Sequence, residues 1–223
     1  IPYSHQDYEV QSFLNLLNPL GYVPPQETEY PFIHTPATLV NKVAKILRPL
    51  SGKNLIALFP GASIIEKRWE DDKFVALADR LSQKGFAVVV LGMANEKQIG
   101  EKMIAGRCGL SLAGKTSLLE TAAVILQSKM LISGDTGVLH IAAGLGVPTV
   151  SLFGPSNIEK WAPKGEQHVV LSRHLPCSPC SEFGYTPKCP VNGRCMSEIT
   201  VDDVVTAVEK LLGRRRKISD FLG

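Results

Sequence analysis

Hydrophobic and polar positions alternate along this chain with two different periods. Short apolar runs predict buried strands over residues 55–61, 86–92, 129–134, 148–154 and 168–173. Helical spacing of apolar positions predicts helices over residues 37–47, 74–85, 95–105, 117–129, 137–146 and 201–213, with Ser117 as a possible N-cap. Near-continuous apolar strands that alternate with helices are typical of a parallel sheet covered on both faces. We therefore predict an α/β fold with a doubly wound, Rossmann-like parallel sheet.

The amino-terminal residues follow a different pattern. Apolar positions recur at helical spacing within residues 5–20, and Gly21 ends that run. Residues 23–36 then contain four prolines, which exclude a regular helix or a central strand. This stretch predicts an extended linker and a domain boundary near residue 35.

Composition limits the classes of function. The 223 residues are 44% hydrophobic and 20% charged, which is ordinary for a globular protein. A net charge of +3 argues against a protein that mainly coats nucleic acid, while small anionic ligands remain compatible. The apolar runs are shorter than the roughly 20 residues that a membrane helix needs. No signal peptide opens the chain, and because Ile1 is its first residue we expect a processed or excerpted product.

Four of the five cysteines form the pattern C-x2-C-x8-C-x5-C, at Cys177, Cys180, Cys189 and Cys195. Four such thiols could close a tetrahedral zinc site. The irregular spacing and the prolines among them favour reduced thiols or a disulfide instead. An odd cysteine count favours a reducing compartment, so we predict a cytoplasmic protein. We expect the fifth cysteine, Cys108, to be inert packing.

Ligands of an open α/β sheet bind beyond the carboxyl ends of its strands, so the loops there are candidate sites. The first such loop, residues 60–71, contains the hydroxyl of Ser63 and the positive charges of Lys67 and Arg68. It could bind an anion, or it could be a solvated helix start. In the second loop, Glu96 could accept hydrogen bonds from a ribose, although an acid that offsets a helix dipole is the simpler interpretation.

The third loop, residues 134–137, has the sequence Gly-Asp-Thr-Gly at a helix start. Its glycines permit close approach of the backbone, and the free N–H groups of the first turn favour an anion. His140 lies one turn further on the same side. The alternative is that Asp135 or Thr136 only caps the helix and His140 is a core residue.

Taken in order, these motifs resemble one family. FPGAS…KRW, LGxxxE, LAGKTSLLE, SGDTGVLHIAAGLGVPTVSLFGPS and a cysteine segment ending in CM-x-x-IT are similar to the bacterial ADP-heptose:lipopolysaccharide heptosyltransferases of glycosyltransferase family 9. The resemblance runs from about residue 53 to 212. It implies one half of a GT-B glycosyltransferase, the carboxy-terminal half that holds the nucleotide-sugar donor.

The resemblance also implies roles around the donor phosphates and the sugar. Lys67 would pair with the phosphates, with Ser63 beside it. Thr136 and Gly137 would bind the diphosphate through their backbone amides, and Asp135 would touch the transferred sugar.

Three further residues complete the implied donor site. Glu96 would hold the adenosine ribose, the backbone around Thr116 would meet the adenine edge, and His140 would support the site. Family members have Thr-like hydroxyls where this chain has Ala62. No metal and no cofactor is expected in this site.

The resemblance divides the chain into three parts. Residues 1–34 would be the end of a missing amino-terminal domain plus a Pro-rich hinge, and residues 35–200 the donor domain with a cysteine-rich loop at 176–196. Residues 201–223 would be a carboxy-terminal helix and a basic tail. A complete member supplies its general base from the amino-terminal domain, so no catalytic residue is expected in this chain.

The implied activity is inverting transfer of heptose from an ADP-sugar donor to a lipopolysaccharide core acceptor. Nucleic acid is not an expected partner, while the basic run 213–217 is compatible with peripheral contact at the inner membrane. Two alternatives are another GT-B enzyme or epimerase that uses a UDP-sugar, and a non-catalytic nucleotide-binding module. A zinc-bearing nucleic-acid binder is a third, weaker alternative.

Overall fold

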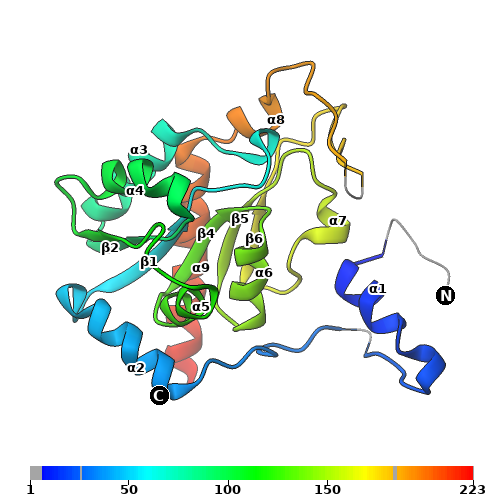
Figure 1. Cartoon of the computed structure of the whole chain (residues 1–223), viewed down its shortest axis with the longest axis horizontal. Coiled ribbons are helices and arrows are strands. Elements are labelled where there is room, and N and C mark those ends of the chain that lie inside the picture. The colour runs from blue at the N-terminus through cyan, green and yellow to red at the C-terminus, as the bar shows by residue number, and fades with distance from the viewer. Residues whose placement is uncertain (1–6, 26, 183–184, 223) are drawn as a thin grey trace.

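A computed structural model describes residues 7–25, 27–182 and 185–222, with side chains as far as residue 213. Its centre is a six-stranded sheet in the order β3-β2-β1-β4-β5-β6 (Figure 1). The strands are β1 (Asn54–Phe59), β2 (Phe86–Val90), β3 (Gly109–Ser111), β4 (Met130–Gly134), β5 (Thr149–Leu152) and β6 (His168–Leu171). All neighbouring pairs are parallel. The predicted doubly wound α/β fold is therefore confirmed.

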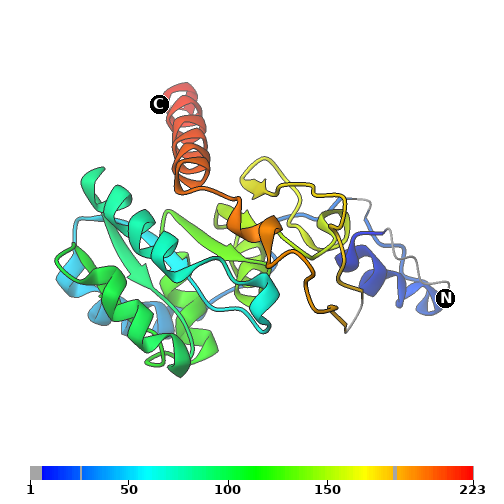
Figure 2. The same ribbon diagram turned by 90° about the horizontal axis from the view of Figure 1, so that it is seen from above.

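Helices cover both faces of this sheet (Figure 2). One face packs against α3 (Asp71–Gln83), α4 (Lys97–Ile104) and α9 (Val201–Leu222), and the other against α2 (Ala37–Ile46), α5 (Leu118–Leu126) and α6 (Gly137–Gly144). Successive strand side chains point to opposite faces. In β1, Ile56 and Leu58 join the first layer, and Leu55 and Ala57 join the second. Burial on both sides explains why the strands are continuously apolar in sequence.

Several short elements were not predicted. They are β3, the one-turn helices α7 (Ile158–Trp161) and α8 (Arg194–Ser197), and the 3-10 turns η2 (Arg48–Leu50) and η3 (Ile65–Lys67). Each is too short to show a period. Two further 3-10 turns, η1 (Asn18–Leu20) and η4 (Ala94–Glu96), lie at the end and at the start of predicted helices. The β3 strand begins at Gly109, where an added Cβ would lie 2.6 Å from the carbonyl oxygen of Val88. Close strand pairing explains the glycine there.

The predicted N-cap of α5 is confirmed. The N–H of Glu120 donates to Ser117 Oγ at 3.3 Å, and the N–H of Ser117 donates to Glu120 Oε2 at 2.8 Å. This reciprocal pair is a capping box, which satisfies two amides that would otherwise lack an acceptor.

The amino-terminal helix is shorter than predicted. It forms α1 (Glu9–Asn15), followed by η1, and leaves Phe13 60% exposed. Residues 5 and 6 of the predicted helix lie outside the described residues. The buried anchor of α1 is polar: Glu9 is 4% exposed, and its Oε2 lies 2.6 Å from Lys160 Nζ on α7. A buried charge needs such a partner, so this ion pair attaches α1 to the sheet domain.

Residues 23–25 and 27–36 form no helix or strand, as the prolines of this stretch predict. They also dock on the domain, because the N–H groups of Phe32 and Ile33 both donate to the carbonyl of Gly144 at 2.8 Å. An added Cβ on Gly144 would lie 2.5 Å from Ile33 Cδ1. The glycine at the end of α6 therefore makes room for the linker.

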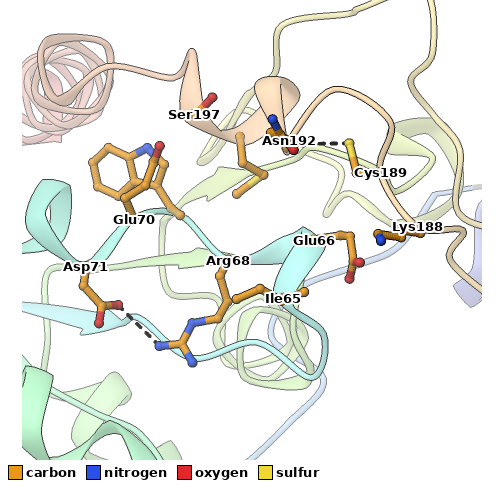
Figure 3. Close-up of a pocket in the computed structure, with 12 residues that line it drawn as sticks. Ile65, Glu66, Arg68, Glu70, Asp71, Lys188, Cys189, Asn192 and Ser197 are labelled. Carbon is orange, nitrogen blue, oxygen red and sulfur yellow. Dashed lines mark hydrogen bonds and ion pairs between the residues drawn. The ribbon is translucent and has the colours of Figure 1, made fainter.

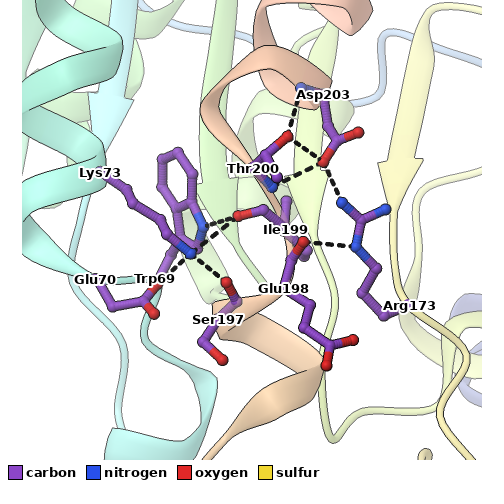
Figure 4. A network of polar contacts seen from close by, with 9 residues as sticks. All are labelled: Trp69, Glu70, Lys73, Arg173, Ser197, Glu198, Ile199, Thr200 and Asp203. Atoms are coloured by element: carbon purple, nitrogen blue, oxygen red, sulfur yellow. Dashed lines mark hydrogen bonds and ion pairs between the residues drawn. The ribbon is translucent and has the colours of Figure 1, made fainter.

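Helix α9 extends to Leu222, beyond the predicted end at residue 213. The side chains of the basic run from Arg214 onward lie outside the described ones. Before α9, the backbone of residues 197–199 accepts hydrogen bonds from three side chains, Trp69, Lys73 and Arg173 (Figure 4). These bonds tie α3 and the segment after β6 to the start of α9. No helix in the described part of the chain is both long and apolar enough to cross a bilayer.

Replacing Trp69 with Phe tests this junction. Trp69 is 1% exposed and donates from Nε1 to the Ile199 carbonyl at 2.9 Å. The variant keeps an aromatic ring but loses the donor, so the free energy of unfolding should fall by about 1–3 kcal/mol. Urea unfolding measures it. Trp161→Phe is the control at the chain's other, half-buried tryptophan, and an equal loss there would contradict the assigned role of the Trp69 bond.

Candidate functional site

The site lies where the chain reverses its direction across the sheet. From β1 the chain goes to β2 and β3 on one side, and from β4 it goes to β5 and β6 on the other. The strands β1 and β4 are neighbours, so the loops that follow them meet at their carboxyl ends. Such a switch point is where open α/β sheets bind ligands.

Lys67 and Asp135 meet at this switch point although 68 positions separate them in sequence. Lys67 Nζ lies 2.6 Å from Asp135 Oδ2. A third residue, Ser156 from the turn after β5, donates from Oγ to the same Oδ2 at 2.6 Å. The Asp135 side chain is 9% exposed and that of Lys67 21%. A positive and a negative group are thus paired at a partly buried position in front of α6.

Thr136 caps α6, so one of the two interpretations of this loop is confirmed for this residue. Its Oγ1 accepts from the N–H of Leu139 at 3.4 Å and shares a hydrogen bond with Ser133 Oγ at 3.0 Å. Capping does not exclude anion binding, because the first N–H groups of a helix have no acceptor within it. Gly137 is exposed, and a Cβ added to it would meet no atom within 4 Å. The backbone at this helix start is open to a ligand.

Gly134 permits a close approach, as predicted, but the approaching group is the protein itself. An added Cβ there would lie 3.2 Å from the carbonyl oxygen of Lys67. The loop after β1 therefore rests directly on the end of β4. This contact brings Lys67 within reach of Asp135.

His140 is half-buried, so it is not a core residue. Its Nε2 lies 3.9 Å from Asp135 Oδ1, whereas Lys67 and Ser156 contact Oδ2. Burial lowers the pKa of the imidazole, the charge of Asp135 opposes this effect, and the charge of Lys67 adds to it. His140 is thus electrostatically part of the cluster.

Glu96 is buried at the carboxyl end of β2, with 2% of its surface exposed. Its Oε2 accepts from the N–H of Met93 at 2.9 Å, so the interpretation as a helix-start acid is confirmed. Its Oε1 lies 3.8 Å from Arg68 Nη1. An added Cβ would lie 3.0 Å from Glu96 at Gly61 and 2.7 Å at Gly92, so both glycines make room for this carboxylate. A ribose contact stays a prediction.

The remaining predicted residues lie at the same edge of the sheet. Ser63 is exposed between β1 and η3, and Thr116 Oγ1 shares a hydrogen bond with Thr121 Oγ1 at 2.9 Å. Sequence reasoning missed Ser156. Its position in the loop after β5, next to the loop after β4, was the available signal.

A cavity of about 660 Å³ adjoins the first loop on the side of α8 (Figure 3). Arg68 donates to Asp71 Oδ1 at 3.3 Å on its wall, and Glu66 lies beside Lys188. Its lining includes Arg68 but neither Lys67 nor Asp135. The largest of the described cavities is therefore next to the charged cluster and separate from it.

The four clustered cysteines line one smaller cavity of about 310 Å³. The N–H of Gly193 donates to Cys189 Sγ at 3.1 Å, and burial raises the pKa of the Cys180 and Cys195 thiols. Among the described residues, no three His, Cys, Asp or Glu side chains stand in an arrangement that could hold a metal ion. All five cysteines are free thiols in this structure.

The prediction that Cys108 is inert packing is wrong. The structure exposes Cys108 in the turn between α4 and β3. Gly106 in this turn has a φ of +71°. The sequence contained no period there from which to judge burial.

The fold and the charged cluster define a doubly wound domain with an anion-compatible helix start at its switch point. The sequence model of glycosyltransferase family 9 (heptosyltransferase) matches residues 5–189. The chain belongs to this family.

Relatives that match this chain in sequence are named lipopolysaccharide heptosyltransferases. The chain is 32% identical to lipopolysaccharide heptosyltransferase 1 of Pseudomonas aeruginosa over 58% of its length and 37% of the relative's. It is 30% identical to lipopolysaccharide heptosyltransferase 3 of Escherichia coli K12 over 93% of its length and 60% of the relative's. It thus spans about two fifths to three fifths of these relatives.

A solved structure agrees. The E. coli ADP-heptose lipopolysaccharide heptosyltransferase II superposes with a TM-score of 0.71 and 25% identity, covering 86% of this chain and 56% of that one. This similarity extends the family assignment from sequence to fold.

The pKa of His140 should shift in opposite directions in two variants. Lys67→Ala removes a repelling charge and should raise it, whereas Asp135→Asn removes an attracting charge and should lower it. Titration of the imidazole proton resonances by NMR measures both shifts. The His140→Gln variant, which lacks this imidazole, identifies the resonance of His140 among those of the five histidines. Shifts of the same sign in both variants would contradict the cluster.

Alkylation should distinguish the cysteines. Cys177 and Cys108 are exposed, whereas Cys195 is buried and has a raised pKa, so its reactive thiolate is scarcer at neutral pH. Under reducing conditions, iodoacetamide should modify the first two before Cys195, and the Cys195 rate should still rise above pH 8.5. Peptide mass spectrometry measures the order. Modification of Cys195 first would show that the cavity is open.

Proposed function

We propose that this chain is the donor-binding part of a glycosyltransferase that moves heptose from ADP-heptose to a lipopolysaccharide core acceptor with inversion. Family membership and the names of the relatives support the reaction class. The observation that carries the proposal is the Lys67–Asp135 pair at the open start of α6. It offers a cation and free amides to a diphosphate, and a carboxylate to the sugar.

The leaving diphosphate is the group that these residues would stabilise. As the bond to the sugar breaks, negative charge grows on the diphosphate. Lys67 and the amides of Thr136 and Gly137 would receive that charge. Lys67 would have to exchange its 2.6 Å contact with Asp135 for the phosphate. Asp135 would then face the sugar, with His140 beside it.

The nucleoside would extend toward the loops after β2 and β3. We propose Glu96 for the ribose, the backbone near Thr116 for the adenine edge, and Ser63 beside the phosphates. Glu96 Oε2 accepts from the N–H of Met93, and its Oε1, which accepts no hydrogen bond from the described residues around it, would be the oxygen for the ribose contact. Arg68 Nη1, 3.8 Å from Oε1, would lie beside this contact.

The acceptor side and the general base would belong to residues outside this chain. The proposed division into residues 1–34, 35–200 and 201–223 is supported by α1, where Phe13 and Leu16 expose apolar surface that a further domain would cover. We also propose peripheral contact with the inner membrane through the basic run 213–217, whose positive charges would attract anionic lipids.

Lys67→Ala tests the donor site. The variant should bind an ADP-sugar about 1–3 kcal/mol more weakly, because a hydrogen bond to a charged group is lost. Isothermal titration of the full chain measures the affinity. Lys84→Ala is the matched control, since Lys84 pairs with Glu209 on the surface at the other end of α3.

Two outcomes would overturn the proposal. Selective binding of a UDP-sugar over ADP-heptose by the unmodified chain would assign it to another nucleotide-sugar enzyme. Equal affinity of Lys67→Ala and Lys84→Ala for the ADP-sugar would remove Lys67 from the site.

A further inference from the structure

One carboxylate oxygen of Asp135, Oδ2, accepts hydrogen bonds from two side chains. Lys67 Nζ and Ser156 Oγ both lie 2.6 Å from Oδ2, while Oδ1 faces His140 at 3.9 Å. If Lys67 transfers to a diphosphate, Ser156 remains as the short donor to this carboxylate. Ser156 is 3% exposed, so water cannot readily replace its hydroxyl.

Hydrogen bonds from the cysteine-rich loop 176–196 hold the turn that carries Ser156. The N–H groups of Cys180 and Ser181 donate to the Pro155 carbonyl at 2.9 and 2.8 Å. Ser178 Oγ donates to the Gly154 carbonyl. Three hydrogen bonds from this loop therefore fix the backbone of the turn.

Close packing at Gly154, the first residue of the turn, also fixes the turn. An added Cβ on Gly154 would lie 2.6 Å from Met196 Sδ and 3.0 Å from Cys195 Sγ. The turn thus packs directly against α8. The turn is held by hydrogen bonds from the cysteine-rich loop and by close packing against α8, and its Ser156 hydroxyl donates to Asp135.

We propose that Ser156 is a positioning residue of the donor site, which holds the Asp135 carboxylate in place for the sugar when Lys67 moves to the diphosphate. The cysteine-rich loop supports this arrangement by fixing the turn 154–156. This inference rests on the proposed function. It assigns Ser156 a role in recognising the sugar and none in binding the nucleotide diphosphate.

The role predicts different effects on two ligands. Ser156→Ala should weaken binding of ADP-heptose roughly tenfold, the effect of one lost hydrogen bond to a charged group. Binding of ADP, which has no sugar, should change less than about twofold on the same reasoning. Isothermal titration of the full chain with both ligands measures the difference. ADP binding also reports that the variant is folded.

A double-mutant cycle tests whether Ser156 acts through Asp135. In an Asp135→Ala background, Ser156→Ala should have no further effect on ADP-heptose affinity. Ser128→Ala is the matched control, because it removes another buried hydroxyl, bonded to the Val124 carbonyl at 2.9 Å. It should leave both affinities unchanged. Ser178→Ala should show the pattern of Ser156→Ala with a smaller loss.

Three other results would contradict the inference. Equal losses for ADP and ADP-heptose in Ser156→Ala would overturn the inference and leave a general structural role. Losses that add in the double variant would also overturn it, because Ser156 would then act independently of Asp135. If the unmodified chain binds ADP but does not prefer ADP-heptose to it, the proposed function fails, and the inference fails with it.

Discussion

The ion pair between Lys67 and Asp135 is the interaction on which the proposed site depends. It joins the loop after β1 to the start of α6, across the line where the sheet changes its direction of winding. Because the pair is partly buried, removal of either partner would leave the other charge unpaired, which is costly. Gly134 lets the two loops touch, and Thr136 fixes the helix start. The pair also keeps the site electrically balanced until an anion arrives.

The surroundings of this pair have a common architecture. On one side, Gly61 and Gly92 make room for the buried carboxylate of Glu96. On the other side, the cysteine-rich loop and α8 enclose the turn that carries Ser156. These contacts limit the positions that Glu96 and Ser156 can take, which is how a preorganised site avoids reorganisation during reaction.

The sheet could be predicted from sequence because its buried strands are apolar on both faces. The same argument failed for β3, which has three residues and begins with glycine, and for the one-turn helices α7 and α8. The Gly-Asp-Thr-Gly loop was identified because it follows a predicted strand. Ser156 was missed since a single hydroxyl in a loop has no pattern; its place after β5 is the only sequence signal, and the contact with Asp135 identifies its partner. The exposure of Cys108 was wrongly predicted for the same reason.

The central claim is that Lys67 exchanges Asp135 for the donor diphosphate at the start of α6. A crystal structure of the chain with ADP-heptose tests it most directly. The expected result is a diphosphate on the amides of Thr136 and Gly137, with Lys67 Nζ on a phosphate oxygen and Ser156 still bonded to Asp135. A diphosphate bound elsewhere, with Lys67 still paired to Asp135, would contradict the claim.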